Sequence, residues 1–217
     1  MATSTITPAP ADATPTTRET ADDQRVHVWP IRIVSVIIGI MWFEQILWKL
    51  PWNNFVSPGE PPNGVEPNPN PTAEQPGPYI DNGYGAYHWM VQGARYGILG
   101  YDQLIKNVAL PNWQLFAWLT FLAETTIAVL LILGLLSRLG GLIALFQSVN
   151  LYLAISRHPQ EWHWTYLFLI ALSFIFLFTG PGRWFGLDQW LRPRLREAFE
   201  RSDGSGNRIS RLLYRLT

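Results

Sequence analysis

The amino-acid sequence predicts an all-α membrane protein, an antiparallel four-helix transmembrane bundle with short outer-surface helices and C-terminal interfacial helices. Three observations support this fold class. Four apolar stretches approach the roughly 20 residues that a helix needs to cross a hydrocarbon core about 30 Å thick. Only two residues separate the second stretch from the third, so a connection this short forces an antiparallel hairpin. The basic residues are also distributed unevenly between the two predicted sides of the membrane.

The composition agrees with a membrane protein and excludes several function classes. The chain has 217 residues, of which 15% are charged and 11 are Trp, which is unusual for a soluble domain of this length. The balance of 16 basic against 16 acidic residues argues against a nucleic-acid partner. The absence of cysteine excludes disulfides, thiol nucleophiles, cysteine-ligated zinc and iron–sulfur clusters.

The chain divides into a tail, a transmembrane domain and a C-terminal region. Residues 1–28 are polar and lack the basic and apolar segments of a cleavable signal, so we expect a disordered cytoplasmic tail. Residues 29–186 form the predicted transmembrane domain, with its outer loop insertion at 51–112. The spans are predicted at about 31–50, 113–136, 139–155 and 162–178.

The segments outside the spans have their own patterns. Residues 56–78 hold too much Pro and Asn for a helix or sheet, and predict an extended outer loop. From Tyr84 to Val108, helical spacing interrupted by glycines indicates one or two short helices that cover the bundle. Residues 187–217 predict cytoplasmic amphipathic helices, the first with Asp188 as its N-cap. These helices fit an anionic membrane surface, and docking to a partner is the alternative.

The Lys and Arg residues set the predicted orientation, because cytoplasmic loops carry an excess of them. With both termini in the cytoplasm, the outer face carries only Lys49, Arg95, Lys106 and Arg157. The inner face carries Arg18, Arg25, Arg32, Arg138, Arg183, Arg192, Arg194, Arg196, Arg201, Arg208, Arg211 and Arg215. This imbalance predicts a multi-pass protein of the plasma membrane. Tryptophans toward the span ends predict an interfacial belt, namely Trp42, Trp48, Trp52, Trp113, Trp118, Trp162, Trp164 and Trp184.

Two acidic residues inside the predicted spans are the leading candidates for function. An ionisable group in hydrocarbon costs a few kcal/mol, so Glu44 and Glu124 need an explanation. Both fall in the outer half of the membrane, as do Gln147 and Asn150 of the third span. Two interpretations remain open. The carboxyl groups tie helices together through Gln147, Asn150 or Lys49, or they line a cavity for a polar-headed lipophile such as a quinone and handle its protons.

Histidine offers little support for a metal site. His88, with Arg95, lies in the predicted outer segment, where both could face a substrate or partner. The stretch from His158 to His163 does not have the spacing of the helical His-Glu-x-x-His motif, so we expect no bound metal. Phosphate loops, dinucleotide fingerprints and nucleophile elbows are also missing from the sequence.

Three places in the sequence resemble the DoxX/DoxD family of small four-helix membrane proteins, which includes the small subunit of thiosulfate:quinone oxidoreductase. The first span carries Arg32, Gly39 and Lys49. The second span carries Glu124, a Leu-rich run, Gly134-Leu and Arg138. After the fourth span, a glycine turn ends in Leu187-Asp188. The insertion at 53–110 and the C-terminal helices depart from the family pattern.

The resemblance implies a membrane subunit of a quinone-linked electron-transfer complex, with other membrane subunits and lipids as partners. In this hypothesis Glu44 and Glu124 are catalytic, and no cofactor is covalently bound. The substrate-binding candidates are His88, Arg95, Lys49, Gln147, Asn150 and Arg138. Because the chain has no motif that ligates a redox cofactor, electrons would come from a partner or directly from substrate. The alternative is a non-enzymatic structural or assembly subunit of a larger respiratory or photosynthetic complex.

Overall fold

The structure, a computed structural model, describes the chain except for residues 1–16, 48, 51–65, 82, 84 and 201–207. Nearly all regular structure in the described residues is helical, and their only β pairing is an isolated bridge between Pro67 and Tyr79. The helices are α1 (Thr17–Leu47), α2 (Gly85–Tyr96), α3 (Tyr101–Leu104), η2 (Ile105–Ala109), α4 (Trp113–Leu133), α5 (Ser137–Ile155), α6 (His163–Thr179), η3 (Pro181–Arg183), α7 (Asp188–Glu200) and α8 (Arg208–Leu216). The prediction of an all-α protein is therefore confirmed.

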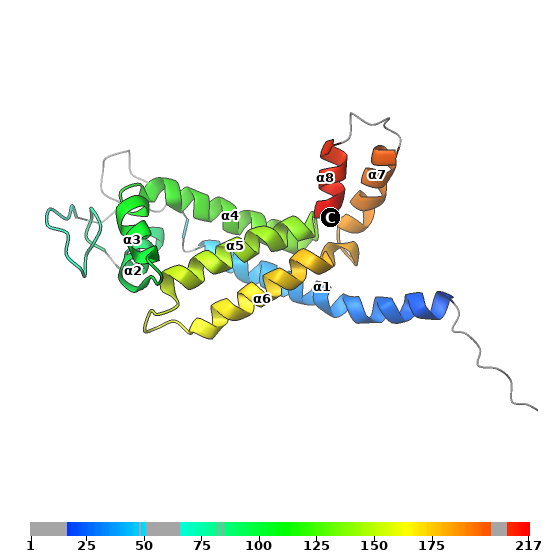
Figure 1. Ribbon diagram of the computed structural model, residues 1–217, viewed down its shortest axis with the longest axis horizontal. Helices are drawn as coiled ribbons and strands as arrows, with labels where there is room; N and C mark the ends of the chain where they lie inside the picture. Colours follow the sequence, from blue (N-terminus) through cyan, green and yellow to red (C-terminus); the bar gives the residue numbers. More distant parts are fainter. Residues whose placement is uncertain (1–16, 48, 51–65, 82, 84, 201–207) are drawn as a thin grey trace, which may run out of the picture.

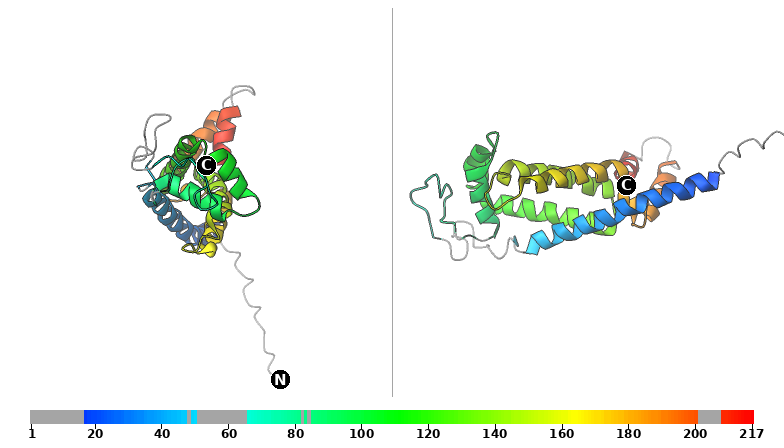
Figure 2. Two further views of the ribbon diagram at one scale, coloured as in Figure 1. Left: turned by 90° about the vertical axis from the view of Figure 1, so that its left-hand side faces the viewer. Right: turned by 90° about the horizontal axis from the view of Figure 1, so that it is seen from below.

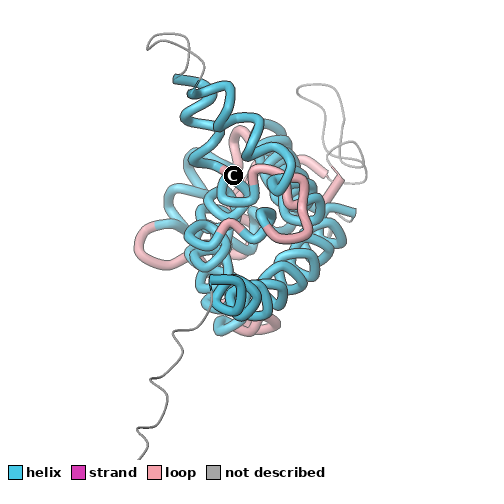
Figure 3. The backbone as a smooth tube through the Cα atoms, turned by 90° about the vertical axis from the view of Figure 1, so that its right-hand side faces the viewer, coloured by secondary structure: helices cyan, strands magenta, loops and turns pink. Residues whose placement is uncertain are grey.

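The long helices α1, α4, α5 and α6 lie lengthwise beside one another, and successive ones run in opposite directions (Figure 1). One end of this assembly is covered by α2, α3 and η2, and we call it the capped end. The other end carries η3, α7 and α8, and we call it the C-terminal end (Figure 1; Figure 3 looks onto it). Helix α5 packs against α4 and α6, whereas α1 packs along α4 and hardly touches α6.

The long helices have the length and apolar character of membrane spans. Residues 29–47 of α1, the whole of α4 and the whole of α5 are long and apolar enough to cross a bilayer. Helix α6 is equally apolar but has 17 residues, so its crossing stays a prediction. Large apolar side chains point outward from α5 and α6, among them Phe146, Phe168 and Phe178. In water such a surface would be costly, and in a bilayer it faces lipid.

The helix boundaries differ from the predictions by up to three residues at the span ends, and by more at the start of α1. Helix α1 begins at Thr17, so residues 17–28 are helical where the sequence predicted a disordered tail. Helix α4 ends at Leu133 rather than 136, because Gly134 and Leu136 both adopt left-handed backbone conformations. A left-handed glycine satisfies the last carbonyl groups of a helix, and here the Gly134 amide donates to Leu130.

The prediction of an interfacial tryptophan belt agrees with the structure only in part. Trp162 and Trp164 are exposed at the start of α6, as predicted. Trp42 and Trp113 are instead buried in the core, with 1% and 4% of their surface exposed. The reason is that α2 and η2 cover this end of the bundle and enclose residues that would otherwise lie at the interface.

At the C-terminal end, polar side chains close the junction between α4, α5 and α7. The fully buried Asp188 carboxylate accepts hydrogen bonds from the Leu136 and Ser137 amides at 2.6 and 2.8 Å. Asp188 was predicted to cap its own helix, but its side chain caps α5. Arg32 donates to the carbonyl groups of Leu131 and Ile132 at 2.6 and 2.7 Å, at the end of α4. Both contacts satisfy backbone groups that a helix end leaves without partners.

Candidate functional site

A cavity of about 340 Å³ lies toward the capped end of the bundle. Its lining residues come from α1, α2, α3, η2, α4, α5 and α6, and from the loop before α6. The walls are mainly apolar and aromatic, and include Trp42, Trp89, Phe116, Leu151 and Leu169. A small number of polar side chains interrupt this lining. This combination is typical of sites that bind small organic molecules.

Four polar residues of the cavity form one hydrogen-bonded chain with a buried carboxylate. The Lys49 ammonium lies 2.9 Å from Glu124 Oε1, and Gln147 Nε2 donates to the same oxygen at 3.2 Å. Asn150 Nδ2 donates to Gln147 Oε1 at 3.3 Å, and the Tyr101 hydroxyl donates to Asn150 Oδ1. Four of these five side chains line the cavity, and Glu124 lies behind them. The chain therefore links the cavity wall to a buried acid.

Helical spacing and one turn bring these residues together. Gln147 and Asn150 are three residues apart on α5, so they share one face of that helix. Lys49 follows the end of α1, where its amide donates to the Ile46 carbonyl at 3.0 Å. Only 9% of Lys49 is exposed, and Glu124 is fully buried. A buried charge of this kind is retained when it is paired and hydrogen-bonded, as it is here.

Two buried polar atoms of the site have no partner among the described residues. One is Glu124 Oε2, the second oxygen of the paired carboxylate. The other is the indole Nε1 of Trp42, a residue that lines the cavity. Buried donors in folded proteins nearly always have an acceptor, so each exception needs an explanation. A ligand oxygen in the cavity would supply an acceptor for the Trp42 donor.

The structure brings together four of the predicted site residues and separates the other four. Glu124, Lys49, Gln147 and Asn150 form the chain described above. Glu44 is exposed on the outward side of α1, while Trp42 and Gln45 of the same helix line the cavity. Glu44 and Glu124 therefore do not meet. Arg138 lies at the opposite, C-terminal end, where it donates to the Phe178 carbonyl at 3.0 Å.

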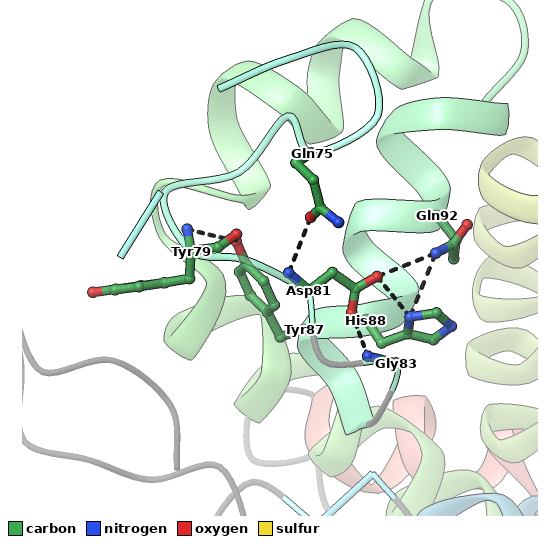
Figure 4. A network of polar contacts seen from close by, with 7 residues as sticks. All are labelled: Gln75, Tyr79, Asp81, Gly83, Tyr87, His88 and Gln92. Carbon is green, nitrogen blue, oxygen red and sulfur yellow. Dashed lines mark hydrogen bonds and ion pairs between the residues drawn. The ribbon is translucent and has the colours of Figure 1, made fainter. Parts of the chain in front are cut away.

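His88 and Arg95 belong to the cap and do not line the cavity. His88 Nδ1 lies 2.8 Å from Asp81 Oδ2, and Gln92 Nε2 donates to the same oxygen at 3.2 Å (Figure 4). Burial favours the neutral form of Asp81, but the hydrogen bonds from His88, the Gly83 amide and Gln92 outweigh it and lower the pKa of Asp81. Arg95 lies over the Tyr96 ring, 5.5 Å from its centre. The hydrogen bonds to Asp81 fasten the loop at 75–81 to α2.

Sequence reasoning missed several residues of the cavity. Tyr101 and Trp89 come from the cap, which the sequence predicted as a cover of the bundle but without indicating which of its side chains line a cavity. Glu161 and Tyr166 also line the cavity, and the Tyr166 hydroxyl donates to Glu161 Oε2 at 2.8 Å. The sequence shows that these two residues are five positions apart, but it gives no sign that they line a cavity. Among the described residues, no group of three or more His, Asp or Glu side chains could hold a metal ion.

Comparison with known proteins gives one match. The sequence model of the family described as "TQO small subunit DoxD" matches residues 89–202, which is more than half of the chain. This region runs from α2 past the end of α7, and so includes Glu124, Gln147, Asn150 and Asp188. No curated protein and no solved structure matches the chain. The family match and the motifs of the second span and the glycine turn lead to one conclusion: this chain is a member of the DoxD family of membrane proteins.

Proposed function

We propose that this chain is the membrane subunit of a quinone-linked oxidoreductase and that its cavity binds the quinone head group. The family description names the small subunit of TQO, which is thiosulfate:quinone oxidoreductase. One structural observation carries the proposal: the buried Trp42 N–H lines an apolar cavity without any acceptor among the described residues. Trp42 and the chain from Lys49 to Tyr101 add polar groups to a lining that is mainly apolar.

The dimensions and chemistry of the cavity fit a quinone ring. Its volume of about 340 Å³ lies near the lower end of the usual range for small-molecule sites. Aromatic and aliphatic walls would hold the faces of a ring, and Trp42, Lys49 and Asn150 present N–H groups to its oxygens. A bound quinone would supply two-electron redox chemistry, taking up two electrons and two protons when it is reduced.

The buried ion pair is suited to hold and move protons. Glu124 Oε1 accepts from both Lys49 and Gln147, whereas Oε2 has no partner among the described residues. Lys49 lies between this carboxylate and the cavity. Lys49 can therefore give one proton to an oxygen in the cavity, and its neutral amine then takes up a proton that comes from water, because the ionised Glu124 carboxylate has none to give. In this proposal Glu44 has no part, because it faces away from the cavity.

The arrangement of the chain in its complex completes the proposal. Electrons would reach the cavity from a partner subunit or from a substrate at the capped end, to which His88 and Arg95 belong. We place the protein in the plasma membrane with its C-terminal end in the cytoplasm. Arg138, Arg183 and the arginines of α7 and α8 all lie at that end, which agrees with the excess of basic residues expected in cytoplasmic segments.

Binding of quinone to purified protein in lipid nanodiscs tests the proposal. The variant Trp42→Phe keeps a ring in the wall but removes the N–H, and we expect it to raise the Kd for a benzoquinone about tenfold. Trp113→Phe is the matched control, because Trp113 is equally buried but does not line the cavity. Failure of the native protein to bind quinone would contradict the proposal, as would equal affinities of the two variants. Equilibrium dialysis measures all three proteins.

A further inference from the structure

The cavity has contributions from two helices that scarcely touch each other. Met41 and Gln45 of α1 line it, as do Thr165 and Leu169 of α6. Helix α1 packs along α4 and makes hardly any contact with α6. In the view from below, α4 is visible between α1 and α6 (Figure 2). The cavity therefore lacks helix-to-helix packing on the side between α1 and α6.

The exposure of the lining residues indicates where the cavity reaches the surface. Four of the lining residues are buried, namely Lys49, Gln147, Ala154 and Ile155. Thr165 lines the cavity and is exposed, and Met41 and Gln45 across from it are partly exposed. Leu104 and Val108 of η2 form a second exposed part of the lining, with 48% and 43% of their surface exposed. The two candidate openings thus lie between α1 and α6 and beside η2.

These openings face different surroundings. Met41 belongs to the apolar segment of α1 from Trp29 to Leu47, and it lies about 9 Å from the end of that helix by the helical rise. An opening there leads into lipid. Leu104 and Val108 belong to the cap, outside the long helices. A site with polar groups inside and a hydrocarbon-facing opening suits an amphiphile whose head group enters first.

We propose that the cavity opens into the bilayer between α1 and α6, and that its ligand is a lipid-borne quinone whose apolar tail lies in this opening. The inference rests on the proposed function, and it adds the route by which the quinone enters. A cavity of about 340 Å³ can hold a ring and its substituents, so a long tail has to lie outside it. Hydrocarbon chains leave water for an apolar surface, which favours the side that faces lipid.

Variants that obstruct each opening test the route. Thr165→Trp fills the opening between α1 and α6, and Val108→Trp fills the one beside η2. The matched control is Leu167→Trp, since Leu167 is exposed on α6 but does not line the cavity. The probes are a benzoquinone with a ten-carbon alkyl chain and the same ring without a chain. We expect T165W to raise the Kd of the tailed quinone about tenfold or more. L167W should bind it like the native protein, V108W should weaken it less than T165W does, and the tail-less ring should still bind all four proteins.

A second measurement uses the native side chains. A quinone with a photoreactive diazirine at the end of its tail should cross-link to peptides of α1 and α6, identified by mass spectrometry. Loss of tailed-quinone binding in V108W but not T165W overturns the proposed route, and so does cross-linking confined to the cap or to α4. If T165W weakens both probes, the cross-linked peptides decide. If neither probe binds the native protein, the proposed function itself fails.

Discussion

At the residue scale, the main feature of the molecule is the buried ion pair of Lys49 and Glu124. Both groups are removed from water, and the carboxylate is fully buried. The net contribution of a buried pair to stability is small, because desolvation offsets most of the attraction. Removing one partner is different, since it leaves a charge buried without compensation. The structural and the proton-handling interpretations of this pair therefore start from the same fact, which is that each buried charge needs the other.

Lys49→Met should destabilise the protein strongly, by about 3–5 kcal/mol, because it leaves the Glu124 carboxylate without its cation. The double variant K49M/E124L removes both charges, and it should recover most of the loss. Lys106→Met, at an exposed position of η2, is the control and should change little. Unfolding in mixed detergent micelles, followed by circular dichroism, measures the free energies of these variants and of the single variant E124L. Additive effects in K49M and E124L would contradict a direct pairing.

Sequence reasoning located Glu124 but not the position of Glu44, and the reason is the character of the two helices. Small residues mark the face of α4 that carries Glu124, and Ala117 and Ala128 are indeed buried with it. The segment of α1 from Trp29 to Leu47 is apolar without one distinct apolar face, so its sequence does not show which side packs on α4. In the structure Trp42 faces inward, and Glu44 does not.

At the scale of elements, the cap depends on the cluster around Asp81. The loop at 75–81 has little regular structure, and it is fixed to α2 by hydrogen bonds to Asp81 and by Tyr87, whose hydroxyl donates to the Tyr79 carbonyl at 2.8 Å. Burial raises the pKa of Tyr87 to about 12, so this phenol remains a donor throughout the neutral range. Because Tyr87 keeps its proton, the attachment of the loop depends on the charge of Asp81.

The cap should loosen in acid and not in base. Because the folded pKa of Asp81 is lowered, its contribution to stability is full above the ordinary value of about 3.9 and is lost as the pH falls through the folded value. Amide-exchange protection factors across residues 75–92 should be constant from neutral pH to about 4 and fall below it. Asp81→Asn should remove this dependence. A constant protection factor in the native protein down to the most acidic condition would contradict it.

The junction at the C-terminal end should depend on Asp188 in the same manner as a helix cap. Asp188→Ala leaves the Leu136 and Ser137 amides without their acceptor, and we expect a loss of about 1–2 kcal/mol. Asp188→Asn keeps one acceptor oxygen and should lose less. Glu197→Ala, at an exposed position of α7, is the control. The same unfolding assay applies, and equal stability of D188A and E197A would rule out the cap.

The sequence identified α7 and Asp188 correctly, but not the helix that Asp188 serves. An aspartate before an apolar pattern predicts the start of its own helix, and α7 does begin there. The Asp188 carboxylate instead bonds amides that are about fifty positions earlier in the chain. Local patterns carry no information on such contacts, because they arise only when α6 returns the chain to this end.

For the whole molecule, the central expectation is that the two ends of the bundle lie on opposite sides of a membrane. The chain has no cysteine, so single cysteines can be introduced without a background. Ala73→Cys near the cap and Arg194→Cys on α7 are both exposed positions. In intact spheroplasts a membrane-impermeant maleimide should label A73C, and it should label R194C only after permeabilisation. Labelling of both from one side would contradict the bundle as a membrane-spanning unit.

Much of the overall arrangement was predictable because it depends on local properties. Apolar length located α4, α5 and α6 to within a few residues, and the short connection at Gly134–Leu136 determined their antiparallel hairpin. The cavity was not predictable, since it depends on how the cap lies over the bundle and on the separation of α1 from α6. The early start of α1 was also missed, because residues 17–28 are polar and their pattern favours a tail.

The contact between Asp188 and the start of α5 has a consequence for biosynthesis. A ribosome delivers residues 136 and 137 well before it reaches residue 188, so the hairpin of α4 and α5 enters the membrane with two amides still lacking their acceptor. The hairpin is completed only when α6 has been translated and has brought the carboxylate back. Nascent chains arrested before residue 188 should therefore be more sensitive to quality-control proteases than chains arrested after it.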